Sequence, residues 1–498
     1  MPLTKIVCTL GPATESPETI RAMIRAGMTV ARLNFSHGTH EDKRRMAEMV
    51  RRISEEENRF VALMGDLQGP KIRVGEMPEE GFVLKEGAEV ILTSEAISDA
   101  EHEIPFPHPE IVPDIHLGDR ILMDDGALEL EAIGIDPPRV RCRVQVGGVL
   151  TSHKGVNLPD VDLQISALTK KDQEDACLAL ELELDYLALS FVRSAQDVED
   201  LRDFLDKEIN APQHRRPGEN PHHLPSLVAK IEKPEALLDL ERIIRVSNAV
   251  MVARGDLGVE TAPERVPLAQ KHIIRLCNEM GRPVITATQM LQSMIENPRP
   301  TRAEASDVAN AILDGSDAVM LSGETSIGKY PVHAVQMMTK IATTVEKSEN
   351  FPYNQLLNVT PTTAKEEEQY TTRHLISRAI GRGTVKIAEE CHATAILTST
   401  ESGRTGRLVA RHRPHSPLIA ATPFAETARR LQMLWGVVPV LVEPFVDTDH
   451  MIQSLVQAAV ERGFAEVGSN VVLTAGIPFE VHGVTNMLKV HTVREEDL

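Results

Sequence analysis

Residues Ser226 to Glu260 read SLVAKIEKPEALLDLERIIRVSNAVMVARGDLGVE, and this stretch decides the fold. It contains two short apolar runs that are typical of buried β-strands, with a segment of helical periodicity between them. Lys230 and Glu232 stand at the end of the first run, and Arg254 and Asp256 follow the second. Cationic and acidic side chains at neighbouring strand ends indicate a metal-assisted reaction on an anionic substrate.

Similar runs recur along the first two thirds of the chain, and most of them precede a segment with helical periodicity. Eight such units predict a (β/α)8 TIM barrel, in which chemistry belongs at the carboxyl ends of the strands. The predicted strands are Lys5–Leu10, Thr29–Asn34, Phe60–Asp66, Tyr186–Phe191, Ser226–Glu232, Ala249–Arg254, Pro283–Thr288 and Ala318–Ser322.

The regular spacing is interrupted once and ends once, which predicts three domains. Residues 74–156 contain short β-rich pieces with turn signals, so we expect a small β-barrel domain inserted into the larger barrel of residues 1–73 and 157–347. The polar stretch Asn350–Glu368 marks the second boundary, and residues 348–498 alternate strand and helix patterns, as in an α/β sheet domain. The Pro- and His-rich stretch Gln213–Pro225 is typical of a surface loop, because His222 and His223 lack partners at metal-ligand spacing.

Composition restricts the classes of partner. The chain has 498 residues and a formal net charge of −20, so neither nucleic acid nor an anionic membrane is an expected partner. No apolar run approaches the roughly 20 residues of a membrane helix, and no signal-peptide core is visible, so a cytoplasmic location is expected. Five widely spaced cysteines form no CxxC pair, which favours reduced, buried thiols.

Polar side chains follow most of the predicted strands. Glu232 and Asp256 offer hard oxygen ligands suited to Mg²⁺ or Mn²⁺. Lys230 supplies a mobile positive charge, and Arg32 a planar guanidinium for a phosphate oxygen. Each residue alone is equally typical of a surface salt bridge, but a coincidence of so many strand ends favours one site. The full set is Arg32, Asn34, Asp66, Lys230, Glu232, Asp256, Thr288, Ser322 and Glu324.

Several segments in order resemble the pyruvate kinase family over nearly the whole chain. They include TKIVCTLGPAT, MTVARLNFSHGTHE, KGVNLPDVDL, AKIEKPEAL, MVARGDLGVE and the long run from ITATQMLQSMIENPRPTRAEASDVA to LSGETSIGKYPVHAV. The resemblance implies transfer of the phosphoryl group of phosphoenolpyruvate to ADP, giving ATP and pyruvate, the final step of glycolysis. It also implies a lid domain on the barrel, a C-terminal regulatory domain and a homotetramer.

The resemblance assigns roles residue by residue. Lys230 is expected to stabilise the transition state, Glu232 and Asp256 to hold the divalent ion, and Arg32 to contact the moving phosphate. Gly255, Asp256 and Thr288 are expected to hold the substrate carboxylate, with Thr288 also near the route of the enolate proton. The expected nucleotide-side residues are Asn34, Phe35, Ser36, His37, Arg73 and Lys154.

One departure from the family pattern concerns potassium. Many members hold K⁺ with residues corresponding to Asn34, Ser36, Asp66 and the carbonyl of Leu67, and carry an acidic residue where this chain has Lys71. Two unit charges about 4 Å apart interact by roughly 4 kcal/mol at an effective dielectric near 20, so an ammonium group can replace the charge of a monovalent ion. We therefore expect no K⁺ requirement, with a solvated lid-hinge lysine as the alternative.

A hydroxyl-rich turn after a C-terminal strand resembles the family's effector-phosphate loop. It contains Thr400, Ser402, Gly403, Arg404 and Thr405, and its backbone amides suit a phosphate. Glu401 stands where members that respond to fructose 1,6-bisphosphate often have lysine, and its carboxylate would repel a second phosphate. We expect a monophosphorylated sugar, a nucleotide, or no effector to act here.

Two other functions use part of the same pattern. A Mg²⁺-dependent barrel lyase acting on pyruvate-like enolates would use the two carboxylates and the arginine, but neither ADP nor the nucleotide-side residues. A catalytically silent, ligand-sensing relative would not need Lys230, Glu232, Asp256 and Thr288 together.

Overall fold

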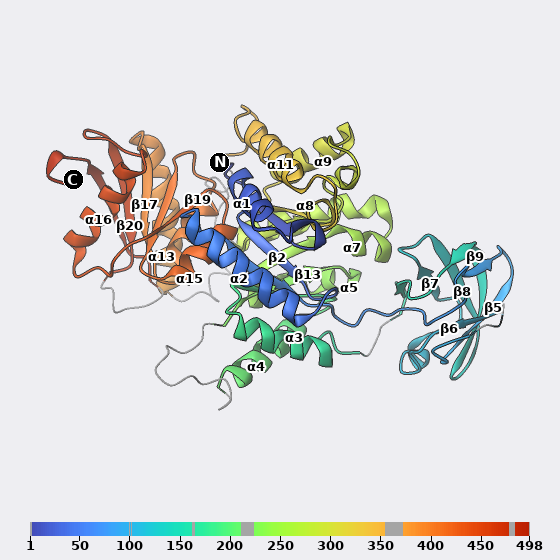
Figure 1. Cartoon of the computed structure of the whole chain (residues 1–498). Helices are drawn as coiled ribbons and strands as arrows, with labels where there is room; N and C mark the ends of the chain where they lie inside the picture. The colour runs from blue at the N-terminus through green and yellow to red at the C-terminus, as the bar shows by residue number, and fades with distance from the viewer. Residues whose placement is uncertain are drawn as a thin grey trace.

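The computed structural model describes residues 2–98, 100, 102–161, 165–210, 224–353, 372–477 and 484–497. Its centre is a closed barrel of parallel strands in the order β1-β16-β15-β14-β13-β12-β3-β2 (Figure 1), as the sequence predicts. The strands are β1 Lys5–Thr9, β2 Val30–Asn34, β3 Ala62–Asp66, β12 Tyr186–Leu189, β13 Ser226–Ile231, β14 Ala249–Ala253, β15 Val284–Ala287 and β16 Ala318–Leu321.

Helices surround this barrel, and their ends follow local capping rules. At the starts of α2, α3 and α9, a threonine cap and an acidic residue three positions later satisfy each other's backbone amides. The barrel helices are α1 Pro17–Ala26, α2 His40–Glu56, α3 Lys170–Glu181, α4 Ala195–Ile209, α5 Pro234–Leu238, α6 Leu240–Val246, α7 Arg254–Glu260, α8 Val266–Met280, α9 Arg302–Leu313, α10 Gly323–Ser326 and α11 Pro331–Glu346.

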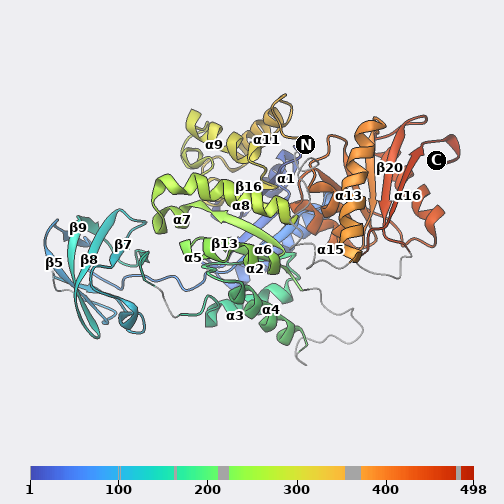
Figure 2. The same cartoon turned by 180° about the vertical axis from the view of Figure 1, so that it is seen from behind.

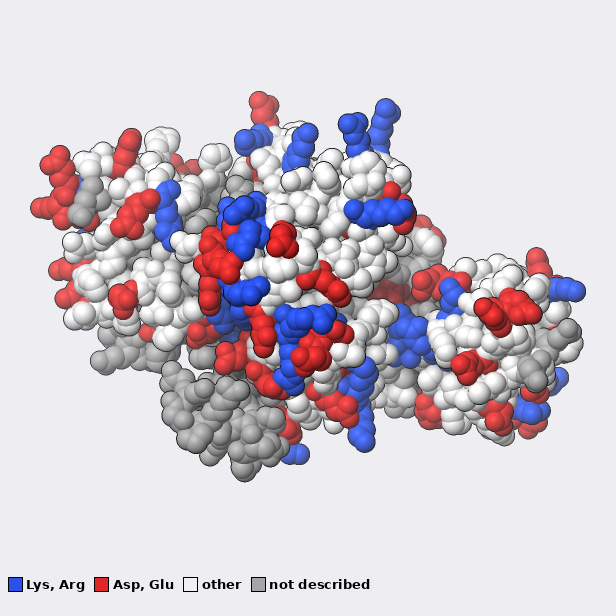
Figure 3. Space-filling view, viewed as in Figure 1, with Lys and Arg blue, Asp and Glu red and all other residues white. Residues whose placement is uncertain are grey.

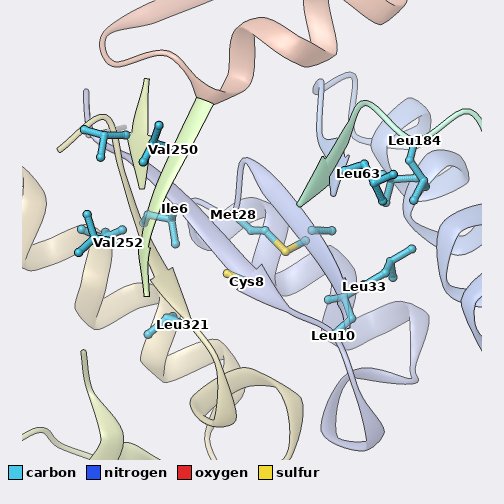
Figure 4. Packing of buried hydrophobic residues seen from close by; sticks show 14 of the residues in the cluster. Ile6, Cys8, Leu10, Met28, Leu33, Leu63, Leu184, Val250, Val252 and Leu321 are labelled. Carbon is cyan, nitrogen blue, oxygen red and sulfur yellow. The ribbon is translucent and has the colours of Figure 1, made fainter. Parts of the chain in front are cut away.

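The main hydrophobic core lies between the barrel strands and these helices. Ile6, Cys8 and Leu33 alternate with inward-facing residues, and Figure 4 shows them with neighbouring apolar side chains of this layer. Alternation places every second strand residue in the outer layer and the others inside the barrel. This packing holds the strands in register, and β2 pairs with β3 so that Asn34 lies opposite Asp66 at the carboxyl end.

The inserted strands form a separate core. A six-stranded sheet, ordered β11-β7-β8-β9-β5-β6, and the two-stranded sheet β10-β4 enclose it, so among the described residues the insertion is a pair of sheets rather than a closed ring. The strands are β4 Phe82–Leu84, β5 Glu89–Thr93, β6 Glu103–Pro105, β7 Arg120–Met123, β8 Leu128–Asp136, β9 Arg139–Val146, β10 Gly148–Leu150 and β11 Val156–Asn157.

The C-terminal residues form the predicted α/β sheet, ordered β19-β18-β17-β20-β21. The antiparallel edge strand β21 was not predicted, because its half-exposed residues lack a clear apolar pattern. The elements are α13 Thr372–Glu390, β17 Ala395–Ser399, α14 Arg404–Ala410, β18 Leu418–Thr422, α15 Ala425–Arg430, β19 Val437–Leu441, α16 Thr448–Glu461, β20 Asn470–Ala475 and β21 Met487–Thr492.

The barrel lies between the inserted sheets and the C-terminal sheet, as Figures 1 and 2 show from opposite sides. The N-terminus lies beside the C-terminal sheet, where Gly436 N donates to the carbonyl of Leu3. The exact domain boundaries stay a prediction. Most of the stretches 213–225 and 350–368, including His222 and His223, lies outside the described residues.

The structure bears on two expectations from composition, the lack of a membrane-spanning helix and the state of the cysteines. No helix within the described ranges is long and apolar enough to cross a bilayer. All five cysteines are free thiols, as predicted, but only Cys8, Cys142 and Cys277 are buried, whereas Cys177 and Cys391 are half-buried.

Candidate active site

Charged side chains from adjacent strands form a continuous network at the carboxyl end of the barrel. The Nε atom of Arg32 on β2 donates to Asp66 Oδ2 on β3 at 2.6 Å, and Lys230 Nζ on β13 lies 3.1 Å from Asp66 Oδ1. Lys230 Nζ also lies 2.8 Å from Glu232 Oε1. The structure therefore brings together four residues that the sequence placed on three separate strand ends.

Asp66 and Lys230 stabilise each other's charged forms despite their burial. Burial alone would lower the pKa of Lys230, but the carboxylates of Asp66 and Glu232 outweigh it and raise that pKa above its usual value. Burial opposes ionisation of Asp66, yet Arg32 and Lys230 hold the pKa of that carboxyl below its usual range. Lys230 is thus a protonated side chain that is only 11% exposed.

Ser190 completes the network, and the sequence pattern did not single it out. Its Oγ accepts from Lys230 Nζ at 2.6 Å and donates to the carbonyl of Leu67 at 2.7 Å. It follows directly after β12, the strand between β3 and β13, so the network crosses four adjacent strands. Its position at the end of a predicted strand was the available signal.

Glu232 carries negative charge that its neighbours only partly balance. Its Oε2 accepts from Phe191 N at 2.6 Å, and Oε1 faces Lys230. Burial and then the nearby negative charge of Asp256 raise the pKa of Glu232, although Lys230 works in the opposite direction. Two neighbouring carboxylates that offer hard oxygen atoms fit a divalent cation such as Mg²⁺. Within the described ranges no third acidic, His or Cys side chain joins them, which fits a site that keeps positions open for substrate oxygens.

A short helix begins at the end of β14, as the sequence suggested for Gly255 and Asp256. The helix α7 starts at Arg254, and the amide of Gly255 donates to Thr288 Oγ1 at 2.8 Å. A Cβ atom at Gly255 would lie 3.3 Å from that hydroxyl oxygen, so glycine allows the close approach. Thr288 itself has a φ of 68°, a conformation that threonine rarely adopts.

Three other polar residues at the strand ends bond to neighbouring protein groups: Arg254, Ser322 and Glu324. Arg254 Nη1 pairs with Asp307 Oδ2 at 2.7 Å and Nη2 donates to the carbonyl of Thr288, which fixes the strained turn. The two carboxylate oxygens of Glu324 accept from the amides of Leu291 and Ser322, and the side chain is fully buried. These groups shape the rim of the barrel rather than face a ligand.

A cluster of positive charge lies beside the network, where the barrel meets the inserted strands; Figure 3 shows Lys and Arg side chains gathered at this neck. Partial burial lowers the pKa of His37, and the charges of Arg73, Lys43, Lys71 and Arg32 lower it further. Lys43 was not predicted as a site residue, although it is buried and its own pKa is lowered by burial. This electropositive surface suits the phosphates of a nucleotide.

The other residues expected on the nucleotide side each have a different set of contacts. Asn34 Oδ1 accepts from Ser36 N at 3.1 Å. The ring of Phe35 belongs to the hydrophobic core, and its carbonyl accepts from Lys171 Nζ, so Phe35 has a packing role in this conformation. Lys154 Nζ lies 2.7 Å from Asp124 Oδ1 in the inserted sheets, and Arg73 Nη1 donates to the carbonyl of His153.

Lys71 lies at the hinge between the barrel and the insertion. It lines a cavity of about 30 Å³ together with Asp256 and Glu260. Among the described residues no carboxylate lies within ion-pair distance of its ammonium group, and Lys71 contributes to the positive potential at His37. Of the expected potassium ligands, Asp66 is already paired with two cations and the carbonyl of Leu67 accepts from Ser190.

The hydroxyl-rich turn of the C-terminal domain lines a cavity of about 320 Å³. Gly403 adopts a φ of 78° before α14, and Thr405 Oγ1 lies 3.0 Å from Thr485 Oγ1 across the turn. The carbonyl of Glu401 accepts from Thr427 Oγ1. Thr400, Ser402 and Arg404 also line this cavity, so the structure brings the expected loop residues together.

Known proteins match the chain over almost its full length. Residues 1–335 match the family model of the pyruvate kinase barrel domain, and residues 378–491 match that of the pyruvate kinase alpha/beta domain. The chain is 41% identical over 495 residues to the pyruvate kinase of Staphylococcus haemolyticus and 42% identical over 496 residues to that of Staphylococcus aureus strain MRSA252. Both alignments cover 99% of this chain and 81% of the relative. A crystal structure of a pyruvate kinase from Cryptosporidium parvum superimposes with a TM-score of 0.88 at 33% identity, covering 98% of this chain and 96% of the other.

Proposed function

The chain belongs to the pyruvate kinase family of phosphotransferases, and from that premise we propose how its barrel site transfers the phosphoryl group of phosphoenolpyruvate to ADP. The observation that carries the proposal is the buried ammonium group of Lys230 between Asp66 and Glu232. In the reaction the bridging O–P bond of phosphoenolpyruvate breaks, a terminal oxygen of ADP bonds to phosphorus, and the enolate of pyruvate is released. The enolate then gains a proton at its methylene carbon to give pyruvate.

Lys230 and Arg32 supply fixed positive charge to the transferring group. Phosphoryl transfer depends mainly on positioning and charge stabilisation, and both effects are stronger in a dry site. Asp66 anchors Arg32 through Nε, and Thr9 Oγ1 accepts from Arg32 Nη1 at 2.9 Å, so the guanidinium plane has one orientation. The remaining guanidinium nitrogen is available for a phosphate oxygen.

The start of α7 and Thr288 form the opposite wall of the pocket. The amide of Asp256 at this helix start suits the substrate carboxylate. The amide of Gly255 and the hydroxyl of Thr288, which bond to each other in this conformation, are expected to turn to that carboxylate when it binds. When bound, a divalent cation held by Glu232 and Asp256 would offset phosphoryl and carboxylate charge. We assign Thr288 the position nearest the proton route, because it is the hydroxyl group of this wall.

An assay of pyruvate and ATP formation from phosphoenolpyruvate, ADP and Mg²⁺ tests the proposal. Equal amounts of the two products, and no pyruvate when ADP is left out, are expected. Pyruvate formation without ADP would instead favour the barrel lyase, and no turnover at all would favour a ligand-sensing relative. Parallel reactions with Mn²⁺ would establish the preferred ion. A homotetramer and a cytoplasmic location stay predictions, the first to be checked by sedimentation velocity.

We propose that Lys71 replaces the charge of a potassium ion, so that K⁺ is not required. Support comes from its place in the hinge cavity with Asp256 and from the two cations that already neutralise Asp66. Turnover should be similar in Tris buffer with and without K⁺. Lys71→Glu should create a K⁺ requirement, whereas Lys85→Glu, on the exposed surface of the insertion, should not. A parent enzyme that needs K⁺ would contradict the proposal.

We also propose that the turn Thr400–Thr405 binds a single phosphate group of an effector, a sugar monophosphate or a nucleotide. Support comes from the cavity that Ser402, Arg404 and Thr405 line together with Glu401. Ribose 5-phosphate, glucose 6-phosphate, AMP and fructose 1,6-bisphosphate should be compared at subsaturating phosphoenolpyruvate. Stronger activation by the bisphosphate than by every monophosphate would contradict the proposal.

A further inference from the structure

A second cationic cavity, of about 230 Å³, lies where the barrel meets the C-terminal domain. It is lined by Arg282, which follows α8 of the barrel, by Arg378 on α13, and by Arg404, Arg407 and Arg411 on or beside α14. Five guanidinium groups in one cavity are unusual in a chain with a net charge of −20. Neither the catalytic network nor the effector turn accounts for this cluster, although Arg404 also lines the effector cavity.

The sequence spacing places like charges on one face of a helix. Arg404, Arg407 and Arg411 are three and four residues apart, so their side chains are neighbours along α14. Like charges at this spacing destabilise a helix by a few tenths of a kcal/mol per pair. The repulsion among these arginines therefore destabilises the helix unless a bound anion offsets their charge.

Two of the arginines are held in place by the barrel. Arg411 donates to the carbonyl of Glu279 at the end of α8, and its guanidinium packs against Gly281, where a Cβ would lie 3.1 Å from Arg411 Nη1. Arg282 Nη2 donates to the carbonyl of Arg245 at 2.9 Å. Both of these acceptors are backbone carbonyls, so the contacts orient the two guanidinium groups.

The electrostatic surroundings of the cavity are mainly positive, and the one carboxylate among its described lining residues, that of Glu279, pairs with Arg275 at 3.2 Å. Burial lowers the pKa of Arg282 to about 10, helped by Arg407, Arg202 and Arg404. Burial, then Arg411, Arg382 and Arg378, lower the pKa of the neighbouring His412 to about 3. Within the described ranges no carboxylate pairs with Arg282, Arg404 or Arg407, in contrast to buried Arg413, whose Nη1 lies 3.2 Å from Asp317 Oδ1.

We propose that this cavity is a second phosphate-binding site, taking a phosphate dianion or the phosphate group of a small ester between the barrel and the C-terminal domain. Guanidinium groups bind phosphate oxygens in pairs, and several of them converge here from both domains. The cavity has room for a phosphate with a small substituent. Bound anion would lower the repulsion among the arginines and so strengthen the contact between the two domains.

Such a site has a short connection to the reaction centre. Arg282 is separated from β15 by Pro283 alone, and β15 ends directly before Thr288. A rigid strand therefore joins the cavity to the wall that would hold the substrate carboxylate. On the other side, Arg404 joins the cavity to the effector turn, so occupancy of the two C-terminal cavities should be coupled.

Equilibrium dialysis of the full chain with radiolabelled inorganic phosphate at low salt tests the proposal by counting ions per chain. The double variant Arg282→Gln/Arg407→Gln should bind one phosphate fewer than the parent, or bind it at least tenfold more weakly. Arg494→Gln, which changes an exposed arginine that does not line the cavity, should not alter the count. Ser402→Glu should remove phosphate from the effector turn alone. A variant that combines Ser402→Glu with Arg282→Gln/Arg407→Gln should therefore lose both bound phosphates.

A charge-conserving variant and a competing ester complete the experiment. Arg282→Lys/Arg407→Lys keeps the charge and should retain phosphate at lower affinity, which separates lost binding from lost folding. Competition by ribose 5-phosphate at a lower concentration than inorganic phosphate would identify an ester as the ligand, and equal competition would identify free phosphate. An unchanged phosphate count in the Gln variant would overturn the proposal. If the Gln variant also has a smaller molecular mass by light scattering than the parent, the arginines instead contact carboxylates of a second copy of the chain, which would likewise overturn the proposal.

Discussion

The two ends of the barrel both contain buried ion pairs, but they differ in how completely their charges are matched. At the amino end, Asp185 before β12 pairs with Arg51 and with Arg429 of the C-terminal domain. Asp317 before β16 pairs with Arg413 of the same domain. The oxygens of both carboxylates also accept backbone amides, from Leu63, Val284 and Trp435. The C-terminal chain therefore closes this end.

At the carboxyl end the corresponding network remains incomplete. Asp66 pairs with two cations, whereas Glu232 shares Lys230 with Asp66, and among the described residues no cation pairs with Asp256. The difference shows that buried carboxylates at strand ends can have two roles. They stabilise a domain contact when every carboxylate oxygen has a partner. They provide a binding site when their negative charge is not paired within the protein, so that a cation and a substrate can bind there.

The largest expected difference between the ends is catalytic. Lys230→Met should lower kcat/KM about 10³-fold, because a fixed charge at the transferring group is lost while side-chain volume is kept. Lys5→Met is the matched control: Lys5 is also buried, but its Nζ donates to the carbonyl of Val437 at the amino end. Its activity should stay within about twofold of the parent. Similar losses in both variants, measured in the ATP-forming assay, would mean that the two ends are not functionally distinct.

The next effect belongs to the amino end and concerns stability. Arg413→Leu should lower the free energy of unfolding by about 3–5 kcal/mol, because it leaves the buried Asp317 carboxylate without its cation. Adding Asp317→Asn removes that charge but keeps an amide-accepting oxygen, so the double variant should recover at least half of the loss. Chemical denaturation of the three proteins, with activity per folded chain as a second readout, checks this. A single variant as stable as the parent would contradict it.

Sequence reasoning could predict which residues stand at strand ends, because strand period and order along the chain decide that. It therefore placed Arg32, Asp66, Lys230, Glu232 and Asp256 at one end of a barrel, and the structure brings them together. Closure of the barrel was predictable for the same reason, since each strand segment had its own apolar pattern and helix.

The missed features depend on which charges meet across long separations in sequence. Ser190 reaches Lys230 only because β12 and β13 are neighbours. Lys43 was missed for another reason: it lies near His37 in the sequence, but a lysine at the start of a helix is normally exposed, and the structure buries it. The pairing of Asp317 with Arg413 joins two domains and leaves no local pattern. The edge strand β21 was missed because pairing with β20, rather than burial, holds it in the sheet.

A third test uses pH to compare the ends. Burial lowers the pKa of Lys5 to about 8, against the opposing effect of Glu346. Between about pH 8 and 10.5 the unfolded chain therefore binds this proton and the folded chain does not, so stability gained from Lys5 rises with pH. The difference in unfolding free energy between the parent and Lys5→Met should shift in favour of the parent by on the order of 3 kcal/mol over this range. A pH-independent difference would place the Lys5 ammonium in contact with solvent.

The smallest expected effect concerns the orientation of Arg32. Thr9 Oγ1 accepts from Arg32 Nη1 and donates to the carbonyl of Leu321, both at 2.9 Å. Thr9→Val keeps the shape and removes this charge-assisted bond, which is worth about 1.5 kcal/mol, so kcat/KM for phosphoenolpyruvate should fall about tenfold. Asp66 still holds Nε, so the loss should appear mainly in KM, as expected for a residue that positions another.

Thr286→Val provides the matched control for that loss. Thr286 is equally buried, and its Oγ1 lies 2.7 Å from Ser316 Oγ, which precedes β16 at the amino end. This variant should lose about 1 kcal/mol of stability and no activity, because its bond is neutral and distant from Arg32. Initial rates over a range of phosphoenolpyruvate, together with thermal unfolding, separate the two results. If Thr9→Val loses only stability, then Asp66 alone orients Arg32, and the incomplete end of the barrel needs fewer supporting contacts than its geometry implies.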